Sequence, residues 1–475
     1  MIDTIREAIA SINSNDAIKI ADWRLVERVI SRQERYYVAN RAEQARMVDD
    51  RGYALTVYVD SAQSGTKFRG EATISLQPSF SAADGLLKIR QAVVAASKSR
   101  NPWFALPEPS APKVKLPISG FESLTPADQV EIARDAFFSA AARFEGSARI
   151  NALELFITRE RRRLLNSRGI DYSTVVWRGY SEFVVEADSP SGTVELFDDI
   201  EFSEPDPARL ASSIASRLAQ VHDRALAAPM PQLRDLPVIL RGKEAEEAFA
   251  WFYGNSRTEA VYSKASAFEV GKSVQGAAHS DVDAEPVPQG ATDSTCATST
   301  SDTSAAAAAL SAPVAEPLDL WAEPAIEGLP ASTAFDPDGF PLERTEVISG
   351  GVLKTLTGSV RHADWLGFPR RGAFPLFSVS PGSTRLEKLH AAPYLEPVMF
   401  SDFQLDPVTG DFGAEIRLAY YFDGKHTVPV SGGSISGSLS ALSGSMRRSV
   451  ETEVASRSRS PVALMLNGVT ITGNA

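Results

Sequence analysis

Apolar residues recur at every second position in several short segments of this chain, and this alternation constrains its fold more than any other feature. Residues 53–59 (YALTVYV) and residues 71–76 both show it. Successive side chains of a strand point to opposite faces of a sheet, so a period of two predicts strands with one buried face. We expect these two strands to form a hairpin whose turn lies near Ser64 and Gly65.

Helices and further strands share the first half of the chain with this hairpin. Apolar residues at helical spacing predict a helix over 84–99, a second one after the capping residue Thr125 and a long third one that ends near Ala225. Candidate strands lie at 152–158, 173–177 and 193–197. We interpret residues 1–230 as an N-terminal α/β domain whose end is marked by several prolines.

The second half of the chain is mostly β. Two glycines at 350–351 separate apolar runs, which is typical of a hairpin, and alternating apolar residues recur at 416–422. A last strand is predicted over 462–471. We therefore expect an α+β fold in which residues 231–475 form a mainly antiparallel β domain.

One stretch interrupts this domain. Residues 277–332 consist largely of Ala, Ser, Thr, Pro and Asp. So few apolar side chains do not offset the conformational entropy that ordering costs, and we predict a disordered insertion. Cys296 falls inside it, where the fixed electropositive pocket of a nucleophilic cysteine is not expected.

Composition narrows the classes of function. The 475 residues carry a formal net charge of −12 without a clustered basic face, which argues against a nucleic-acid-binding protein. No apolar run approaches the roughly 18 residues of a membrane span, and the first residues lack the pattern of an export signal. A single cysteine excludes a disulfide framework and multi-cysteine metal sites. We expect a cytoplasmic protein with no membrane and no nucleic-acid partner.

The residues that could carry chemistry have simpler structural explanations. No two of the five histidines are three to five residues apart, so the helical ligand pair of a zinc site is absent. The histidines are His222, His279, His362, His390 and His426. Glu244, Glu246 and Glu247 fit the first turn of a helix, whose dipole favours acids. We interpret the arginine-rich run 159–163 as a solvated loop between two strands and residues 336–339 as a turn.

Several stretches, taken in order, nevertheless resemble a known family. They are residues 154–169 with the segment Asn166-Ser167-Arg168-Gly169, residues 335–354, residues 409–430, and residues 435–437 with 461–473. The residue types in these stretches, and the order of the stretches along the chain, resemble the TldD/PmbA (TldD/TldE) family of bacterial peptide-processing metalloproteases. The resemblance covers most of residues 50–475.

This family has two kinds of subunit. The catalytic kind carries a helical His-Glu-x-x-x-His zinc motif and a third ligand nearer the C-terminus, whereas the partner kind lacks the motif. At the equivalent place residues 241–253 (RGKEAEEAFAWFY) contain no histidine, and residues 261–266 continue as in the partner kind. Glutamates and aromatic rings cannot replace two imidazoles on one helical face. The resemblance therefore implies a TldE-like subunit, a pseudoenzyme with no catalytic residues, metal ligands or cofactor of its own.

The resemblance also implies partners. Zinc would be held by a TldD-like subunit, and the heterodimer would enclose a cavity that admits unfolded peptide. This chain would then form cavity wall and interface. Its candidate peptide-binding residues are Tyr262, Ser263, Lys264 and Ser266, because they follow the degenerate helix.

Two other functions remain open from the sequence. A stand-alone metallopeptidase could hold zinc through His362, His390 and a carboxylate. A homomeric peptide-binding protein would need no protease partner. The metal content of the purified chain and the presence of a stoichiometric companion in the native cell distinguish the three.

Overall fold

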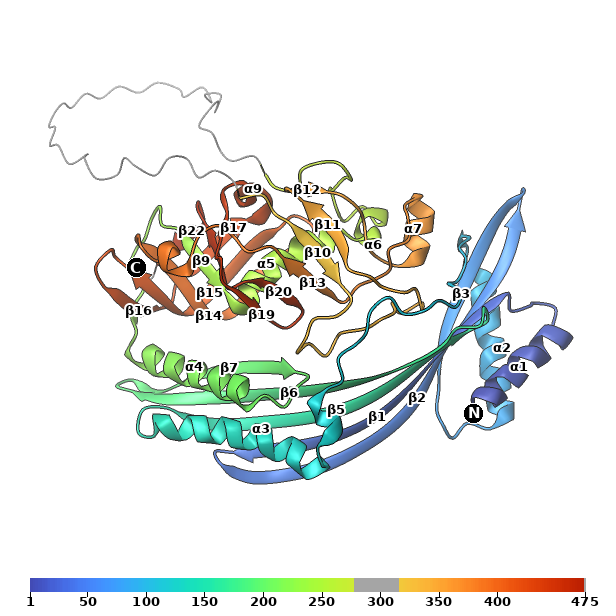
Figure 1. The fold of residues 1–475 in the computed structure, drawn as a ribbon, viewed down its shortest axis with the longest axis horizontal. Coiled ribbons are helices and arrows are strands. Elements are labelled where there is room, and N and C mark those ends of the chain that lie inside the picture. The colour runs from blue at the N-terminus through green and yellow to red at the C-terminus, as the bar shows by residue number, and fades with distance from the viewer. Residues whose placement is uncertain (277–315, 474–475) are drawn as a thin grey trace, which may run out of the picture.

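The first part of the protein is built on a seven-stranded antiparallel sheet with the strand order β4-β3-β2-β1-β5-β6-β7 (Figure 1). The computed structural model describes residues 1–276 and 316–473. The strands of this sheet are β1 (Asp22–Val38), β2 (Arg41–Gln63), β3 (Thr66–Leu76), β4 (Asn101–Pro102), β5 (Arg149–Asn166), β6 (Asp171–Ser189) and β7 (Gly192–Phe202). All five strand segments predicted for the first half lie within them, and Ser64 and Gly65 form the expected turn between β2 and β3.

Four helices cover one face of this sheet. They are α1 (Ile2–Asn15), α2 (Ala82–Lys98), α3 (Pro126–Ala141) and α4 (Pro207–Leu226). The pair α1 and α2 packs at one end, over Leu25 and Leu55, and the pair α3 and α4 packs at the other, over Leu153 and Leu155. The strand register places these odd-numbered positions on a common face. The even-numbered positions of β1 and β5 therefore point to the opposite face.

The second part of the protein contains two sheets with a helix between them. The six-stranded sheet has the order β12-β11-β10-β13-β20-β19. The nine-stranded sheet contains the path β18-β21-β9-β14-β15-β16-β8, and in addition β17 pairs with β15 and β22 pairs with β17. Helix α5 (Gly242–Asn255) contacts β13 and β20 of the first sheet and β9, β14 and β21 of the second. It therefore runs through the main core of this part. The mixed architecture confirms the predicted α+β fold.

The bounds of these elements are as follows: β8 (Ala228–Pro229), β9 (Val238–Arg241), α6 (Thr258–Tyr262), β10 (Leu320–Glu323), β11 (Thr345–Ser349), β12 (Val352–Leu353), α7 (Val360–Leu366), β13 (Leu376–Val379), α8 (Leu386–Leu389), β14 (Tyr394–Leu405), β15 (Asp411–Phe422), β16 (Thr427–Ser431), β17 (Ser434–Ser438), α9 (Leu439–Leu442), β18 (Arg447–Arg448), β19 (Thr452–Val454), β20 (Ser458–Pro461), β21 (Ala463–Leu466) and β22 (Thr470–Thr472). The glycine pair at 350–351 joins β11 and β12, as the sequence predicts.

The predicted disordered insertion is wrong at its C-terminal end. Residues 316–332 are ordered and supply β10, which pairs with β11 and β13 inside the six-stranded sheet. Leu318 and Leu320 are fully buried there. A composition averaged over 277–332 hides this short apolar pattern, whose burial offsets the cost of ordering. Residues 277–315, including Cys296, lie outside the described residues.

Two further predictions need correction. The arginine-rich run 159–163 is not a loop between strands but the middle of β5, paired with β1 and β6 on both sides. The last predicted strand, 462–471, is divided into β21 and β22 by a turn at Gly468, whose φ of 81° favours glycine. Both differences arise because pairing and turn geometry depend on neighbours that are distant in sequence.

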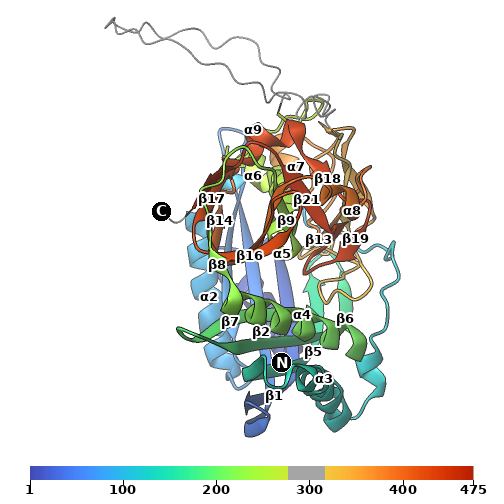
Figure 2. The same ribbon diagram turned by 90° about the vertical axis from the view of Figure 1, so that its left-hand side faces the viewer.

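The two parts of the protein are joined by more than the chain connection. Figure 2 shows α4 between the seven-stranded sheet and strands of the nine-stranded sheet, and α4 contacts both. Tyr420 donates a hydrogen bond of 2.6 Å to Asp223 of α4 across this contact. Arg24 of β1 pairs with Asp338 of the second part. In the described ranges, none of the helices has the length and apolar character needed to cross a membrane.

Candidate functional site

Helix α5 occupies the place where the family resemblance puts the zinc-binding helix of catalytic subunits. Its buried positions carry alanines, aromatic rings and Glu246, which is 4% exposed. The Glu246 carboxylate accepts a hydrogen bond of 2.8 Å from the backbone N–H of Arg457 and one of 2.7 Å from the hydroxyl of Ser458. Glu246 is thus more than a first-turn acid, because it ties α5 to β20.

Replacing Glu246 by alanine is expected to lower the free energy of unfolding by about 2–3 kcal/mol, because the Arg457 N–H and the buried Ser458 hydroxyl lose their acceptor. Glu246→Gln keeps one acceptor oxygen and should cost less. Urea unfolding measures the change in the free energy of unfolding for both variants. The matched control is Glu247→Ala on the same helix, whose side chain is only half-buried; an equal loss for this variant would contradict the assigned role.

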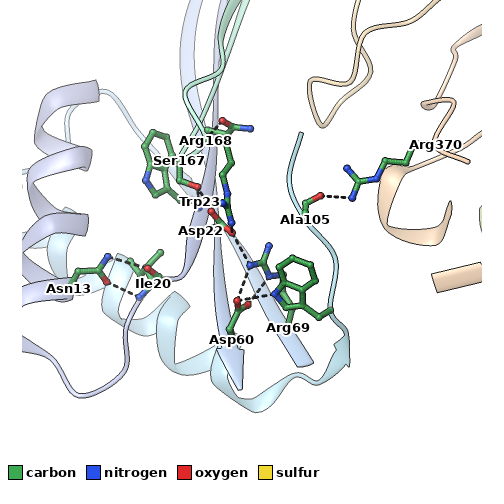
Figure 3. Close-up of polar contacts among 12 residues, drawn as sticks. Asn13, Ile20, Asp22, Trp23, Asp60, Arg69, Ala105, Ser167, Arg168 and Arg370 are labelled. Carbon is green, nitrogen blue, oxygen red and sulfur yellow. Dashed lines mark hydrogen bonds and ion pairs between the residues drawn. The ribbon is translucent and has the colours of Figure 1, made fainter. Parts of the chain in front are cut away.

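The segment Asn166-Ser167-Arg168-Gly169, part of the family resemblance, has a structural task in this chain. It forms the turn between β5 and β6 and binds the start of β1 (Figure 3). The Asp22 carboxylate accepts hydrogen bonds from the Ser167 hydroxyl at 2.6 Å and from Arg168 at 2.8 Å. Burial alone raises the pKa of Asp22, but these hydrogen bonds and the charge of Arg69 outweigh it and hold the pKa below its ordinary value.

The four predicted peptide-binding residues lie around the end of α6. Tyr262 is 41% exposed and packs against His362 and Trp365, with ring centroids 5.2 and 5.0 Å away. Ser263 and Lys264 are exposed. Ser266 donates a hydrogen bond of 2.8 Å to the Asn255 carbonyl and so fixes the loop after α5. Peptide binding by these residues stays a prediction.

The histidines of the alternative zinc site have separate neighbours. His362 on α7 shares a hydrogen bond of 2.7 Å with Ser359, and burial is the first cause that lowers its pKa. His390 lies 2.5 Å from Glu396. Within residues 1–276 and 316–473, no group of three or more His, Cys, Asp or Glu side chains converges in a way that could hold a metal ion. His279 lies outside these residues.

A cleft of about 610 Å³ separates the helix-free face of the seven-stranded sheet from residues 330–337 and 373–375. Its sheet side is formed by even-numbered positions of β1, β5 and β6. Five arginines line it: Arg28, Arg32, Arg162, Arg178 and Arg257. Tyr172 of β6 stacks on Phe335 of the opposite wall with centroids 3.8 Å apart, so the two parts of the protein meet in the lining.

The lining of this cleft is positively charged. Its carboxylates are Glu160, Glu201 and Asp336, fewer than its arginines. Burial, together with the charge of Asp338, raises the pKa of Asp336 above its ordinary value, which weakens its negative charge in the cleft. A positive cleft contrasts with a chain whose formal net charge is −12. Such a lining favours a ligand that carries negative charge.

Sequence reasoning missed this cleft because the run 159–163 was interpreted as a loop. The run itself carries no alternation that would reveal a strand, because all five of its residues are charged. The arginines of β1 and β6 also join those of β5 only through the strand register, which no local pattern specifies.

Comparisons with known proteins agree on the fold. Residues 298–473 match the family model described as "PmbA/TldA metallopeptidase C-terminal domain". No curated protein matches the sequence significantly. The structure is similar to that of TldE from Thermococcus kodakarensis, with a TM-score of 0.73 and 14% identity over 100% of both chains.

Two other solved structures are similar along their full length. A proposed modulator of a DNA gyrase from Thermotoga maritima has a TM-score of 0.71 and 14% identity, covering 99% of this chain and 100% of that chain. A proposed modulator of DNA gyrase from Bacteroides thetaiotaomicron has a TM-score of 0.75 and 15% identity, covering 100% of this chain and 99% of that chain. At these identities the likeness shows a common fold.

Proposed function

We propose that this chain belongs to the TldD/PmbA family, whose C-terminal domain model matches residues 298–473. We propose further that it is the non-catalytic, TldE-like subunit of a two-subunit zinc metalloprotease that processes unfolded peptides, in line with its structural similarity to TldE. The observation that carries this proposal is the make-up of α5. Its buried positions are filled by core side chains such as Phe249 and Phe252, and its one deeply buried acid, Glu246, is bound to β20. A zinc ion needs several converging nitrogen, sulfur or oxygen ligands, which this helix does not supply.

The cleft between the two parts of the protein supports the second half of the proposal. A subunit without catalytic groups can still form the wall that holds a substrate beside a partner's zinc. The arginine-lined cleft, about 610 Å³ in volume, is suited to hold an extended segment of chain. In this function the TldD-like partner supplies the zinc-activated water, and the present chain supplies binding and interface.

Purification from the native cell tests the proposal. An affinity-tagged chain is expected to carry a stoichiometric companion that contains the helical zinc motif. The pair should cleave an unstructured polypeptide and lose this activity on chelation, while the separated chain should be inactive. Cleavage by the chain alone that chelation stops would favour the stand-alone metallopeptidase. A chain that binds peptide but elutes without a companion would favour the homomeric peptide-binding protein.

A further inference from the structure

Four of the five arginines of the cleft lie in two rows that cross β1, β5 and β6. The strand register aligns Arg28, Arg162 and Thr174 in the first arginine row and Arg32, Thr158 and Arg178 in the second. A row without arginine, formed by Ile30, Glu160 and Val176, lies between them. The two arginine rows are four residues apart along the strands, or about 13 Å at 3.3–3.4 Å per residue. An extended polypeptide lying along these strands spans the same distance between its residues i and i+4.

Of the five arginines that line the cleft, Arg162 alone forms no ion pair within the described part of the chain. Arg28 binds Glu160 with two hydrogen bonds of 2.8 Å, Arg178 pairs with Glu201, and Arg32 lies 2.7 Å from Glu34. Arg162 makes neither an ion pair nor a side-chain hydrogen bond among the described residues. The Arg162 side chain is exposed to the cleft, and the loss of solvation there, together with the nearby charge of Arg28, lowers its pKa against the opposing charge of Glu160. An anion beside Arg162 relieves this unfavourable environment.

The lining between the arginine rows favours a peptide over a nucleic acid. Ile30 and Val176 stand between the rows and offer apolar contact, whereas Glu160 and Glu201 repel a continuous chain of phosphates. Guanidinium groups bind carboxylates through paired, charge-assisted hydrogen bonds. The matching pattern is therefore a carboxylate, an apolar side chain and a second carboxylate at alternate positions of an extended segment.

We propose that this cleft binds acidic segments of polypeptide in which two carboxylate side chains, four residues apart, reach the two arginine rows. The inference rests on the proposed function only in taking a polypeptide as the ligand. It specifies which class of polypeptide the cleft of this subunit binds. Arg162 is the central anchor, because it is the cleft arginine without an ion pair among the described residues. Ile30 and Val176 contact the residue between the two acids.

A peptide-binding measurement on the purified full chain tests the proposal without a companion. The probe is a fluorescently labelled peptide with the sequence SESVSES, and its neutral counterpart is SQSVSQS. At low salt we expect the acidic peptide to bind at least tenfold more tightly, and a rise in salt should weaken it. Arg162→Gln should reduce its affinity five- to tenfold. The control Arg90→Gln removes the same charge from the partly exposed Arg90–Asp16 pair and should leave affinity unchanged.

Several results would overturn the proposal. Equal affinity for the two peptides would do so, as would equal losses in the Arg162 and Arg90 variants. Full competition by free glutamate would show that single carboxylates suffice, and stronger binding of a single-stranded oligonucleotide would assign the cleft to nucleic acid. Circular dichroism confirms that each variant is folded. This binding test uses the chain alone, so a negative result would not contradict its proposed function as a subunit of a protease. Likewise, a purification that yields no companion would not contradict acidic-peptide binding in the cleft.

Discussion

Replacing Phe249 by alanine is expected to lower the free energy of unfolding by about 3–5 kcal/mol. Phe249 lies on α5 with 0% of its side chain exposed, inside the core between the two C-terminal sheets. Strands on both sides hold its neighbours in place, so they cannot collapse into the cavity that the missing ring leaves. Urea unfolding followed by circular dichroism measures the change.

The control for this variant is Phe197→Ala on β7. The Phe197 side chain is 51% exposed, so the same truncation should cost less than about 1 kcal/mol. A similar loss in both variants would show that α5 is not packed as a core helix. The argument that its rings serve packing rather than a metal site would then fail.

Replacing Arg69 by methionine is expected to lower the free energy of unfolding by a similar amount, about 3–5 kcal/mol. Arg69 is 1% exposed and binds two carboxylates, Asp22 at 2.8 Å and Asp60 at 2.7 and 2.9 Å (Figure 3). Methionine fills much of the space but leaves the buried Asp22 with one cation fewer. The cost is the desolvation of a carboxylate whose charge is no longer balanced.

The matched variant is Arg90→Met. Its ion pair with Asp16 has the same chemistry, but the two side chains are 43% and 28% exposed. Solvent weakens such a pair, so the loss should stay below about 1 kcal/mol. Equal effects in the two variants would show that burial does not strengthen the contribution of Arg69. Thermal unfolding at constant pH compares them directly.

Local patterns predicted most elements of this fold because the interactions that produce them are short in range. The period of two in 53–59 and the capping residue Thr125 each identified an element that the structure contains. Local patterns failed where pairing decides the outcome. The run 159–163 looks like a charged loop on its own, and it is a strand because β1 and β6 bind both of its edges.

The features of the candidate site also fall into those that the sequence alone reveals and those that depend on the fold. The absence of imidazoles from α5 is visible in the residues themselves, because a metal ligand is a matter of side-chain chemistry. The role of Glu246 could not be predicted, since its two hydrogen-bond donors lie more than 200 residues further along the chain. The charged cleft depends on the register of three strands and on the wall that residues 330–337 provide.

Residue chemistry and short-range periodicity thus established the α+β class, most strands and helices, and the lack of a helical zinc motif. The joining of α5 to β20, the order of residues 316–332 and the two rows of arginines arose from long-range packing. The physical reason is that a side chain's type is fixed by the chain, whereas its neighbours, burial and counter-charges are set by which distant segments pack together.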